Sequence, residues 1–252
     1  MFPGKIAETA PDRHAIVMAG TGETLTYRQL DEGANRVSQL MASHGLQPGD
    51  HVAICLENHP RFFETVWGCH YAGLVYTCCS SRLTTDELAY IINDCGAKVF
   101  ITSKHKADQA EAIVASTPNL VARYMLDGTT THYDSYESAV TAQSDQPLAQ
   151  RFEGTDMLYS SGTTGRPKGV MLTNNNFFAL IPFAAEIWKF TDRTVNLVAM
   201  PLFHIGGGGW ATAGMALGAK SVIIRDVNPA EIVTLIGKHR ITHGFLVPVL
   251  LQ

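Results

Sequence analysis

The chain has 252 residues, a net charge of −4 and a composition that is 46% hydrophobic and 17% charged. This balance is typical of a globular protein with a buried core, and the absence of a basic excess argues against nucleic acid as a partner. No apolar run is long enough to predict a transmembrane segment, and the first ten residues do not resemble a secretory signal, so we expect a cytoplasmic protein.

The first half of the chain alternates short apolar runs with amphipathic stretches. Thr26 and Gln29 have the spacing of a capping box, which predicts a helix that ends before Gly45, and Thr84 with Glu87 predicts another. Two more helices are predicted near residues 60 and 104. The predicted strands are residues 51–56, 74–78, 98–102 and 121–126. Repeated strand–helix–strand order is typical of a parallel sheet covered by helices.

The second half repeats this alternation after a polar segment, residues 141–154, which we interpret as a surface connection between two lobes. Its predicted strands are residues 156–159, 194–200, 221–225 and 241–247. Its predicted helices are residues 175–188, a helix after the glycines 206–209, and one opened by Asn228 and Pro229. The predicted fold class is α/β, with layered, parallel-rich sheets flanked by helices. The expected domains are a first lobe, residues 1–150, and a second, residues 151–252.

The cysteines are odd in number, lie in apolar segments and lack the CxxC spacing of a zinc or redox site. We therefore expect buried thiols in a reducing compartment. The five residues are Cys55, Cys69, Cys78, Cys79 and Cys95.

The most informative stretch is residues 159–170, which read YSSGTTGRPKGV. Glycines let a backbone turn tightly and point N–H groups into one concave space, where hydroxyls and a lysine add further donors to phosphate oxygens. The alternative, a hydrophilic turn, is disfavoured by the ordered run between two apolar segments. The predicted phosphate-binding residues are Ser160, Ser161, Gly162, Thr163, Thr164, Gly165 and Lys168.

Neighbouring motifs are excluded by spacing. A P-loop needs glycine before its lysine and a hydroxyl after it, whereas Pro167 precedes Lys168 and Gly169 follows. Neither Ser160 nor Ser161 has the flanking glycines of a hydrolase GxSxG elbow. The GxGxxG pattern is also absent from this stretch.

This stretch resembles the signature loop of the adenylate-forming superfamily, which includes acyl-CoA synthetases, firefly luciferase and peptide-synthetase adenylation domains. It departs from the usual Y-T-S-G-T-T-G-x-P-K-G-V at Ser160, which keeps the hydroxyl. Further similarity covers residues 73–87, 93–97, 201–206 and 243–250. Among these enzymes the chain resembles the N-terminal portion of a bacterial fatty acyl-CoA ligase. The resemblance implies that the fold is part of a large N-terminal domain.

The resemblance implies a two-step reaction that uses ATP, Mg²⁺ and CoA. A carboxylate attacks the α-phosphate to give acyl-AMP and pyrophosphate, and the CoA thiol then displaces AMP. Lys168 and His204 would be the catalytic residues, and Ser160 would lie near the magnesium ion. The acid would be bound by His204, Gly207, Gly208, Val247 and Pro248. The alternatives are a histidine that caps the Pro201 turn, a flexible glycine-rich helix entry, and apolar core at residues 247–248.

Several features of the resembled enzymes have no counterpart in the sequence: the magnesium-binding glutamate, the ribose-binding aspartate, the hinge, and the lysine of the small C-terminal domain. We therefore expect an incomplete N-terminal fragment that is inactive alone. Two alternatives stay open, namely an aryl- or other carboxylate-CoA ligase and a non-catalytic remnant that kept the fold. Homo-oligomerisation and peripheral contact with a membrane also stay open.

Overall fold

The computed structural model describes residues 2–160 and 165–250, and the chain divides into two compact units. Unit 1 consists of Met1–Asp31, Glu57–Phe63 and Asn175–Gln252, and unit 2 of Glu32–Leu56 and Glu64–Asn174. The predicted lobes follow chain order, whereas these units interleave along the sequence. The reason is long-range pairing: β1 (His14–Met18) lies parallel to β11 (Lys220–Ile223), some 200 residues later.

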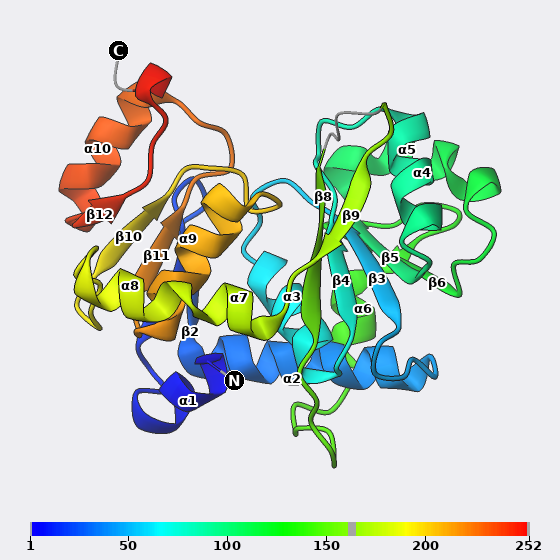
Figure 1. Cartoon of the computed structure of the whole chain (residues 1–252), viewed down its shortest axis with the longest axis horizontal. Coiled ribbons are helices and arrows are strands. Elements are labelled where there is room, and N and C mark those ends of the chain that lie inside the picture. The colour runs from blue at the N-terminus through cyan, green and yellow to red at the C-terminus, as the bar shows by residue number, and fades with distance from the viewer. Residues whose placement is uncertain (1, 161–164, 251–252) are drawn as a thin grey trace. The chain divides into compact units, whose positions relative to one another are not determined.

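Unit 2 is built on a seven-stranded sheet with the order β7-β6-β5-β3-β4-β8-β9 (Figure 1). All neighbouring pairs are parallel except β8 and β9, which form an antiparallel hairpin at one edge. The inner strand β3 is buried on both faces, as its continuous apolar run predicts. The strands are β3 (His51–Cys55), β4 (Val75–Cys78), β5 (Ala97–Ser103), β6 (Ala122–Leu126), β7 (Asp134–Ser135), β8 (Thr155–Ser160) and β9 (Lys168–Met171).

Both predicted capping boxes are confirmed. Thr84 accepts a hydrogen bond from the Glu87 N–H while the Glu87 carboxylate accepts one from the Thr84 N–H, and Thr26 and Gln29 make the same reciprocal pair. These bonds satisfy N–H groups that a helix start otherwise leaves without partners. The helices of this part of the chain are α2 (Tyr27–Ser43), α3 (Phe62–Tyr71), α4 (Thr85–Asp94), α5 (Ala107–Ala112) and α6 (Tyr136–Thr141), with 3₁₀ turns η1 (Lys104–Lys106) and η2 (Val114–Ser116).

Unit 1 contains a five-stranded sheet with the order β12-β10-β11-β1-β2. Only the β1–β2 pair is antiparallel. Leu197 and Val222 of this sheet pack with Ile232 and Leu235 of α10 in one apolar cluster. The remaining elements are α1 (Phe2–Thr9), β2 (Thr24–Thr26), α7 (Asn174–Phe178), α8 (Leu180–Glu186), β10 (Val195–Val198), α9 (Ile205–Ala216), α10 (Pro229–His239), β12 (His243–Gly244) and the 3₁₀ turn η3 (Pro248–Leu250).

The predicted α/β class is confirmed, but several element boundaries differ. The helix predicted at residues 175–188 is divided into α7 and α8, and the strand predicted at residues 241–247 shortens to the two residues of β12. Only Asn196 and Leu197 of β10 pair with β12. The helix predicted after the glycines begins before them, at Ile205, so the glycines belong to its first turns.

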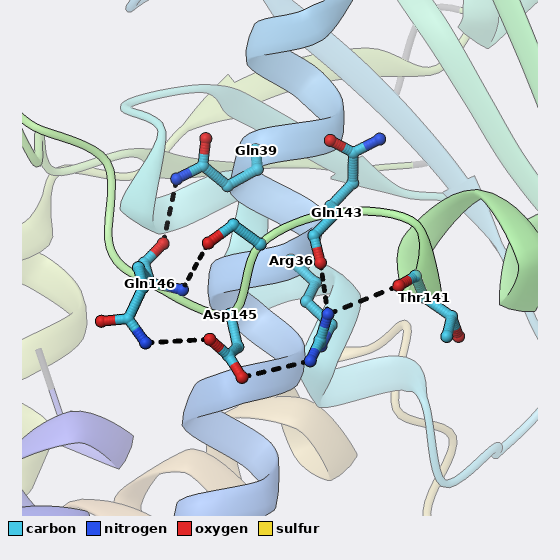
Figure 2. A network of polar contacts seen from close by, with 7 residues as sticks. Arg36, Gln39, Thr141, Gln143, Asp145 and Gln146 are labelled. Atoms are coloured by element: carbon cyan, nitrogen blue, oxygen red, sulfur yellow. Dashed lines mark hydrogen bonds and ion pairs between the residues drawn. The ribbon is translucent and has the colours of Figure 1, made fainter.

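The connection predicted at residues 141–154 contains no helix or strand from residue 142 onward. Arg36 of α2 donates hydrogen bonds to the carbonyl oxygens of Thr141 and Gln143 and pairs with Asp145 at 3.1 Å (Figure 2). Gln39, one turn further along α2, donates to the carbonyl oxygen of Gln146 at 2.9 Å. The connection is therefore polar at its surface but anchored along α2 by side chain-to-backbone bonds.

All five cysteines are buried thiols, as expected from their apolar surroundings. Burial raises the pKa of Cys69 to about 12, so this thiol stays protonated at physiological pH. Among the described residues, no helix is both long enough and apolar enough to cross a membrane.

Candidate functional site

The predicted phosphate-binding stretch joins the two strands of the β8–β9 hairpin in unit 2. Ser160, the last residue of β8, pairs with Lys168, the first residue of β9, and both side chains are exposed. Gly165 has φ +108°, a conformation that side chain-bearing residues rarely adopt. The other predicted residues, Ser161, Gly162, Thr163 and Thr164, lie outside the described residues. The structure thus brings Ser160 and Lys168 together at the end of the hairpin.

Four residues before Ser160 in β8, Asp156 is half-buried, and its Oδ1 atom is inaccessible to solvent. Its Oδ1 atom has no hydrogen-bond partner within the described chain, and burial raises the pKa of this carboxyl to about 7. Tyr76, which pairs with Asp156 across the sheet, and Cys78 also have raised pKa values, chiefly because of burial and secondarily because of Asp156. This carboxyl therefore takes up its proton at a much higher pH than an exposed aspartate does.

In unit 1, His204 ends a tight turn and caps α9. Its N–H donates to the Pro201 carbonyl oxygen at 3.1 Å, and its ring Nδ1 accepts a hydrogen bond from the Gly206 N–H at 3.0 Å. The capping role considered as an alternative is therefore present. Because a neutral imidazole that accepts through Nδ1 carries its proton on Nε2, the exposed ring retains a donor that the cap does not use.

The glycines after His204 allow the first turn of α9 to pack directly on the backbone of residues 200–202. A Cβ atom at Gly207 would lie 2.2 Å from the Pro201 carbonyl oxygen, and one at Gly208 would lie 2.6 Å from that of Leu202. Gly207 is buried. These glycines therefore serve close backbone packing, rather than a flexible helix entry.

The last two predicted substrate residues lie beyond β12. Val247 is half-buried, and Pro248 is exposed at the start of η3, so neither is fully buried core. The adjoining Phe245 is 44% exposed, and its ring lies 3.3 Å from the position that a Cβ atom of Gly206 would occupy. The ring thus faces the helix turn that His204 caps.

Phe245 belongs to an aromatic cluster of unit 1. Its ring centroid lies 5.8 Å from that of Trp210 on α9, and Trp210 lies 4.8 Å from Phe190 and 5.0 Å from Trp188. His243 stacks on Phe190 at 4.8 Å. These distances are within the range of favourable ring–ring contacts.

Asn58 is a structural support of the His204 turn that sequence reasoning missed. Its side-chain amide donates to the carbonyl oxygens of Met200 and Ile224, and its Oδ1 accepts from the Leu202 N–H at 2.8 Å. One buried amide thereby joins the segments that follow β10 and β11. The available signal was an asparagine shortly after a buried strand, which alone is too common to interpret.

We expect Asn58→Ala to lower the free energy of unfolding by about 2–4 kcal/mol, because three backbone groups lose a buried partner. Urea denaturation measures this, with the exposed Asn119→Ala as the control. If Asn58→Ala lowers the free energy of unfolding no more than Asn119→Ala does, Asn58 does not support the turn.

The predicted residues fall into two groups that belong to different units: Ser160, Gly165 and Lys168 in unit 2, and His204, Gly207, Gly208, Val247 and Pro248 in unit 1. Across residues 2–160 and 165–250, no three His, Cys, Asp or Glu side chains are grouped so as to hold a metal ion. The magnesium role predicted for Ser160 remains a prediction.

Comparison with known proteins identifies the family. The chain is 32% identical to the fatty acid–[acyl-carrier-protein] ligase ScoC of Streptomyces coeruleorubidus over 98% of its length and 47% of that protein. It is 31% identical to a feruloyl-CoA synthase of Amycolatopsis sp over its whole length and 49% of that protein. The chain therefore spans about half the length of these curated relatives.

The solved structures agree with the sequence relatives. The N-terminal domain of FACL13 from Mycobacterium tuberculosis, solved with an inhibitor, matches 99% of this chain with a TM-score of 0.91 and 25% identity, and the match covers 63% of that domain. The AMP-binding enzyme family matches residues 5–252. The chain therefore belongs to the AMP-binding enzymes, the adenylate-forming superfamily that its sequence resembles.

Proposed function

We propose that this chain belongs to an ATP-dependent acid–thiol ligase that activates a fatty acid as acyl-AMP and transfers the acyl group to CoA. The observation that carries the proposal is the end of the β8–β9 hairpin, where Ser160 and Lys168 are paired and exposed beside Gly165. Membership of the AMP-binding enzymes and similarity to a fatty acid ligase support it.

In this proposal the hairpin binds the β- and γ-phosphates. The Lys168 ammonium group supplies a mobile positive charge, and the Ser160 hydroxyl supplies a donor and a hard oxygen ligand. Magnesium commonly takes one or two protein oxygens and completes its shell with phosphate oxygens and water, so a single hydroxyl here fits such a site. When bound, the ion would neutralise phosphate charge as pyrophosphate leaves.

His204 would act on the acid in this proposal. Because Nδ1 is held by the Gly206 N–H, the ring orientation is fixed and Nε2 presents a hydrogen-bond donor. A donor fixed in this way can stabilise negative charge that develops on the carboxylate or the α-phosphate during acyl-AMP formation. Gly207 and Gly208 hold the turn that carries this ring.

An aromatic acid is the second candidate substrate. The exposed Phe245 ring and its contact with Trp210 lie beside the helix turn capped by His204, and an aryl substrate would gain ring–ring contacts there. The similarity to a feruloyl-CoA synthase points in the same direction. Whether the acyl group goes to CoA or to a carrier-protein thiol, as the name of ScoC indicates for that relative, is a second point to test.

We expect Lys168→Ala to lower carboxylate-dependent ATP–pyrophosphate exchange by about a hundredfold, because a positive charge that stabilises the phosphates is lost. Exchange is measured on this chain and on any longer product that contains it, with acids from acetate to long-chain fatty acids and with ferulate. The exposed Lys238→Ala is the control.

The acid that gives the highest exchange separates the two candidates, and acylated CoA or carrier protein identifies the acceptor. If a folded longer product that contains this chain shows no exchange with any acid, the activity is excluded and a non-catalytic remnant of the fold remains. If Lys168→Ala and Lys238→Ala behave alike, the role given to the hairpin is wrong.

A further inference from the structure

Asp94, the last residue of α4, joins two tyrosines from different parts of unit 2. The Tyr159 hydroxyl donates to its Oδ2 at 2.5 Å, and the Tyr90 hydroxyl lies 3.2 Å from its Oδ1. The first distance is that of a strong hydrogen bond to a charged acceptor. Tyr159 immediately precedes Ser160, so this bond ties the end of β8 to α4.

Tyr90 reaches the other arm of the hairpin. Its hydroxyl also lies 3.2 Å from the carbonyl oxygen of Pro167, which immediately precedes Lys168. The guanidinium carbon of Arg166 lies 5.2 Å from the centroid of the Tyr90 ring, within the range of a cation–π contact. The backbone before Ser160 and the backbone before Lys168 thus both contact one pair of residues on α4.

The sheet gives this end of the hairpin little support. Only Thr155 and Asp156 of β8 pair with β4, so residues 157–160 of β8 have no ladder partner in that strand. The β8–β9 ladder itself reaches only to the Ser160–Lys168 pair. Side chains of α4 therefore supply contacts to the end of the hairpin that β4 does not make.

Interactions within α4 do not favour a carboxylate at Asp94. A carboxylate in the last turn of a helix faces the negative end of the helix dipole, which is mildly unfavourable, and α4 has no basic residue in that turn. The two tyrosine hydroxyls offset this cost. Burial and the bond to Asp94 both raise the pKa of Tyr159, so its hydroxyl keeps its proton and remains a donor.

Gly169 makes room for this arrangement. It pairs with Tyr159 across the hairpin, and a Cβ atom at Gly169 would lie 3.3 Å from the Tyr159 ring and closer still to the end of the Met157 side chain. The absent side chain lets the tyrosine ring lie across β9 while its hydroxyl reaches Asp94.

We propose that Tyr90, Asp94 and Tyr159 form a brace that fixes the end of the β8–β9 hairpin on α4 and so positions Ser160 and Lys168 for a magnesium-bound polyphosphate. The inference rests on the proposed function of the hairpin. The three brace residues contact the backbone that carries the binding groups, so they are positioning residues and do not themselves bind the phosphates.

The test compares Tyr159→Phe, Asp94→Asn and Tyr90→Phe with Tyr133→Phe. Tyr133 is the matched control because its buried hydroxyl, also in unit 2, donates to the Ala110 carbonyl oxygen at 2.9 Å, away from the hairpin. Amide hydrogen exchange is measured for residues 157–160 and 168–171 and for β5 and β6. Calorimetry gives the dissociation constant of magnesium pyrophosphate, and a thermal melt gives stability without ligand.

Tyr159→Phe and Asp94→Asn are expected to speed exchange in the hairpin about tenfold and to weaken pyrophosphate binding by about the same factor. Tyr159→Phe removes the hydrogen bond to Asp94, and Asp94→Asn removes the negative charge and one of the two acceptor oxygens. Tyr90→Phe should have a smaller effect, because the single Tyr90 hydroxyl proton is shared between two acceptors at longer distances. Exchange in β5 and β6 should stay unchanged, and melting temperatures should fall no further than in Tyr133→Phe.

The brace is disproved if hairpin exchange and pyrophosphate affinity in Tyr159→Phe and Asp94→Asn match those of Tyr133→Phe. Lys168→Ala separates this outcome from failure of the proposed function. If the wild-type protein binds no pyrophosphate, or if Lys168→Ala binds it equally well, the function of the hairpin is wrong, and hydrogen exchange alone then decides whether the brace exists.

Discussion

Replacing Gly207 by alanine is expected to lower the free energy of unfolding by about 3 kcal/mol, through overpacking against backbone. The new methyl group would lie 2.2 Å from the Pro201 carbonyl oxygen and 2.6 Å from that of Met200. Alanine gains about 1 kcal/mol over glycine in helix propensity, but this gain is smaller than the cost of moving two backbone segments apart. Relief of the clash must also shift the turn that ends in His204.

Other glycines of unit 1 supply graded controls. A methyl group at Gly209 meets only the flexible end of Ile205, and one at Gly237 in α10 meets nothing within 4 Å. Gly209→Ala should therefore cost little, and Gly237→Ala should stabilise by about 1 kcal/mol through helix propensity. Urea denaturation measures the free energy of unfolding of each variant and so gives their order of stability. If Gly207→Ala is as stable as Gly237→Ala, the close packing of α9 on residues 200–202 is not present in solution.

The strands and helices with strong local signals were predictable from the sequence. The capping box of Thr84 and Glu87 forms as its spacing indicates, and the buried strand β3 is a continuous apolar run. The short strands β1 and β2 were missed, and so was the interleaving of the units. The interleaving depends on the pairing of β1 with β11, which lie so far apart in sequence that no local pattern links them. The strands β1 and β2 pair with each other locally and were missed because they are short.

The sequence predicts the candidate binding residues but not the residues that support them. Ser160 and Lys168 are predicted from an ordered run of glycines, hydroxyls and a lysine, groups that a phosphate-binding loop places close together in the chain. Asn58 and Asp94 act through residues more than 60 positions away, with hydrogen bonds that only the fold creates. For the glycines after His204 the sequence left close approach and a flexible helix entry equally open, and the structure uses Gly207 and Gly208 for close backbone packing.

Asp156→Asn is expected to stabilise the protein increasingly as the pH rises from 5 to 8. Burial raises the pKa of Asp156 to about 7, from 3.8 for an unperturbed aspartate. Between these two pH values the carboxyl is ionised in the unfolded chain but protonated in the folded protein. Asp156 therefore lowers the free energy of unfolding by about 1.4 kcal/mol for each pH unit of increase. The stability that Asp156 contributes is fully present only below pH 3.8, the pKa of this carboxyl in the unfolded chain. It is lost as the pH rises to about 7, the pKa of the carboxyl in the folded protein.

An asparagine at position 156 has the same shape and does not ionise. The free energy of unfolding of Asp156→Asn minus that of the wild type should therefore grow by about 3 kcal/mol between pH 5 and pH 8, and change little above that. Urea denaturation at several pH values measures it, with Asp226→Asn at an exposed carboxyl as the matched control for charge removal. A difference that stays constant across this range would show that the Asp156 carboxyl ionises normally in the folded protein, and that water or a partner reaches the Oδ1 atom at the base of the hairpin.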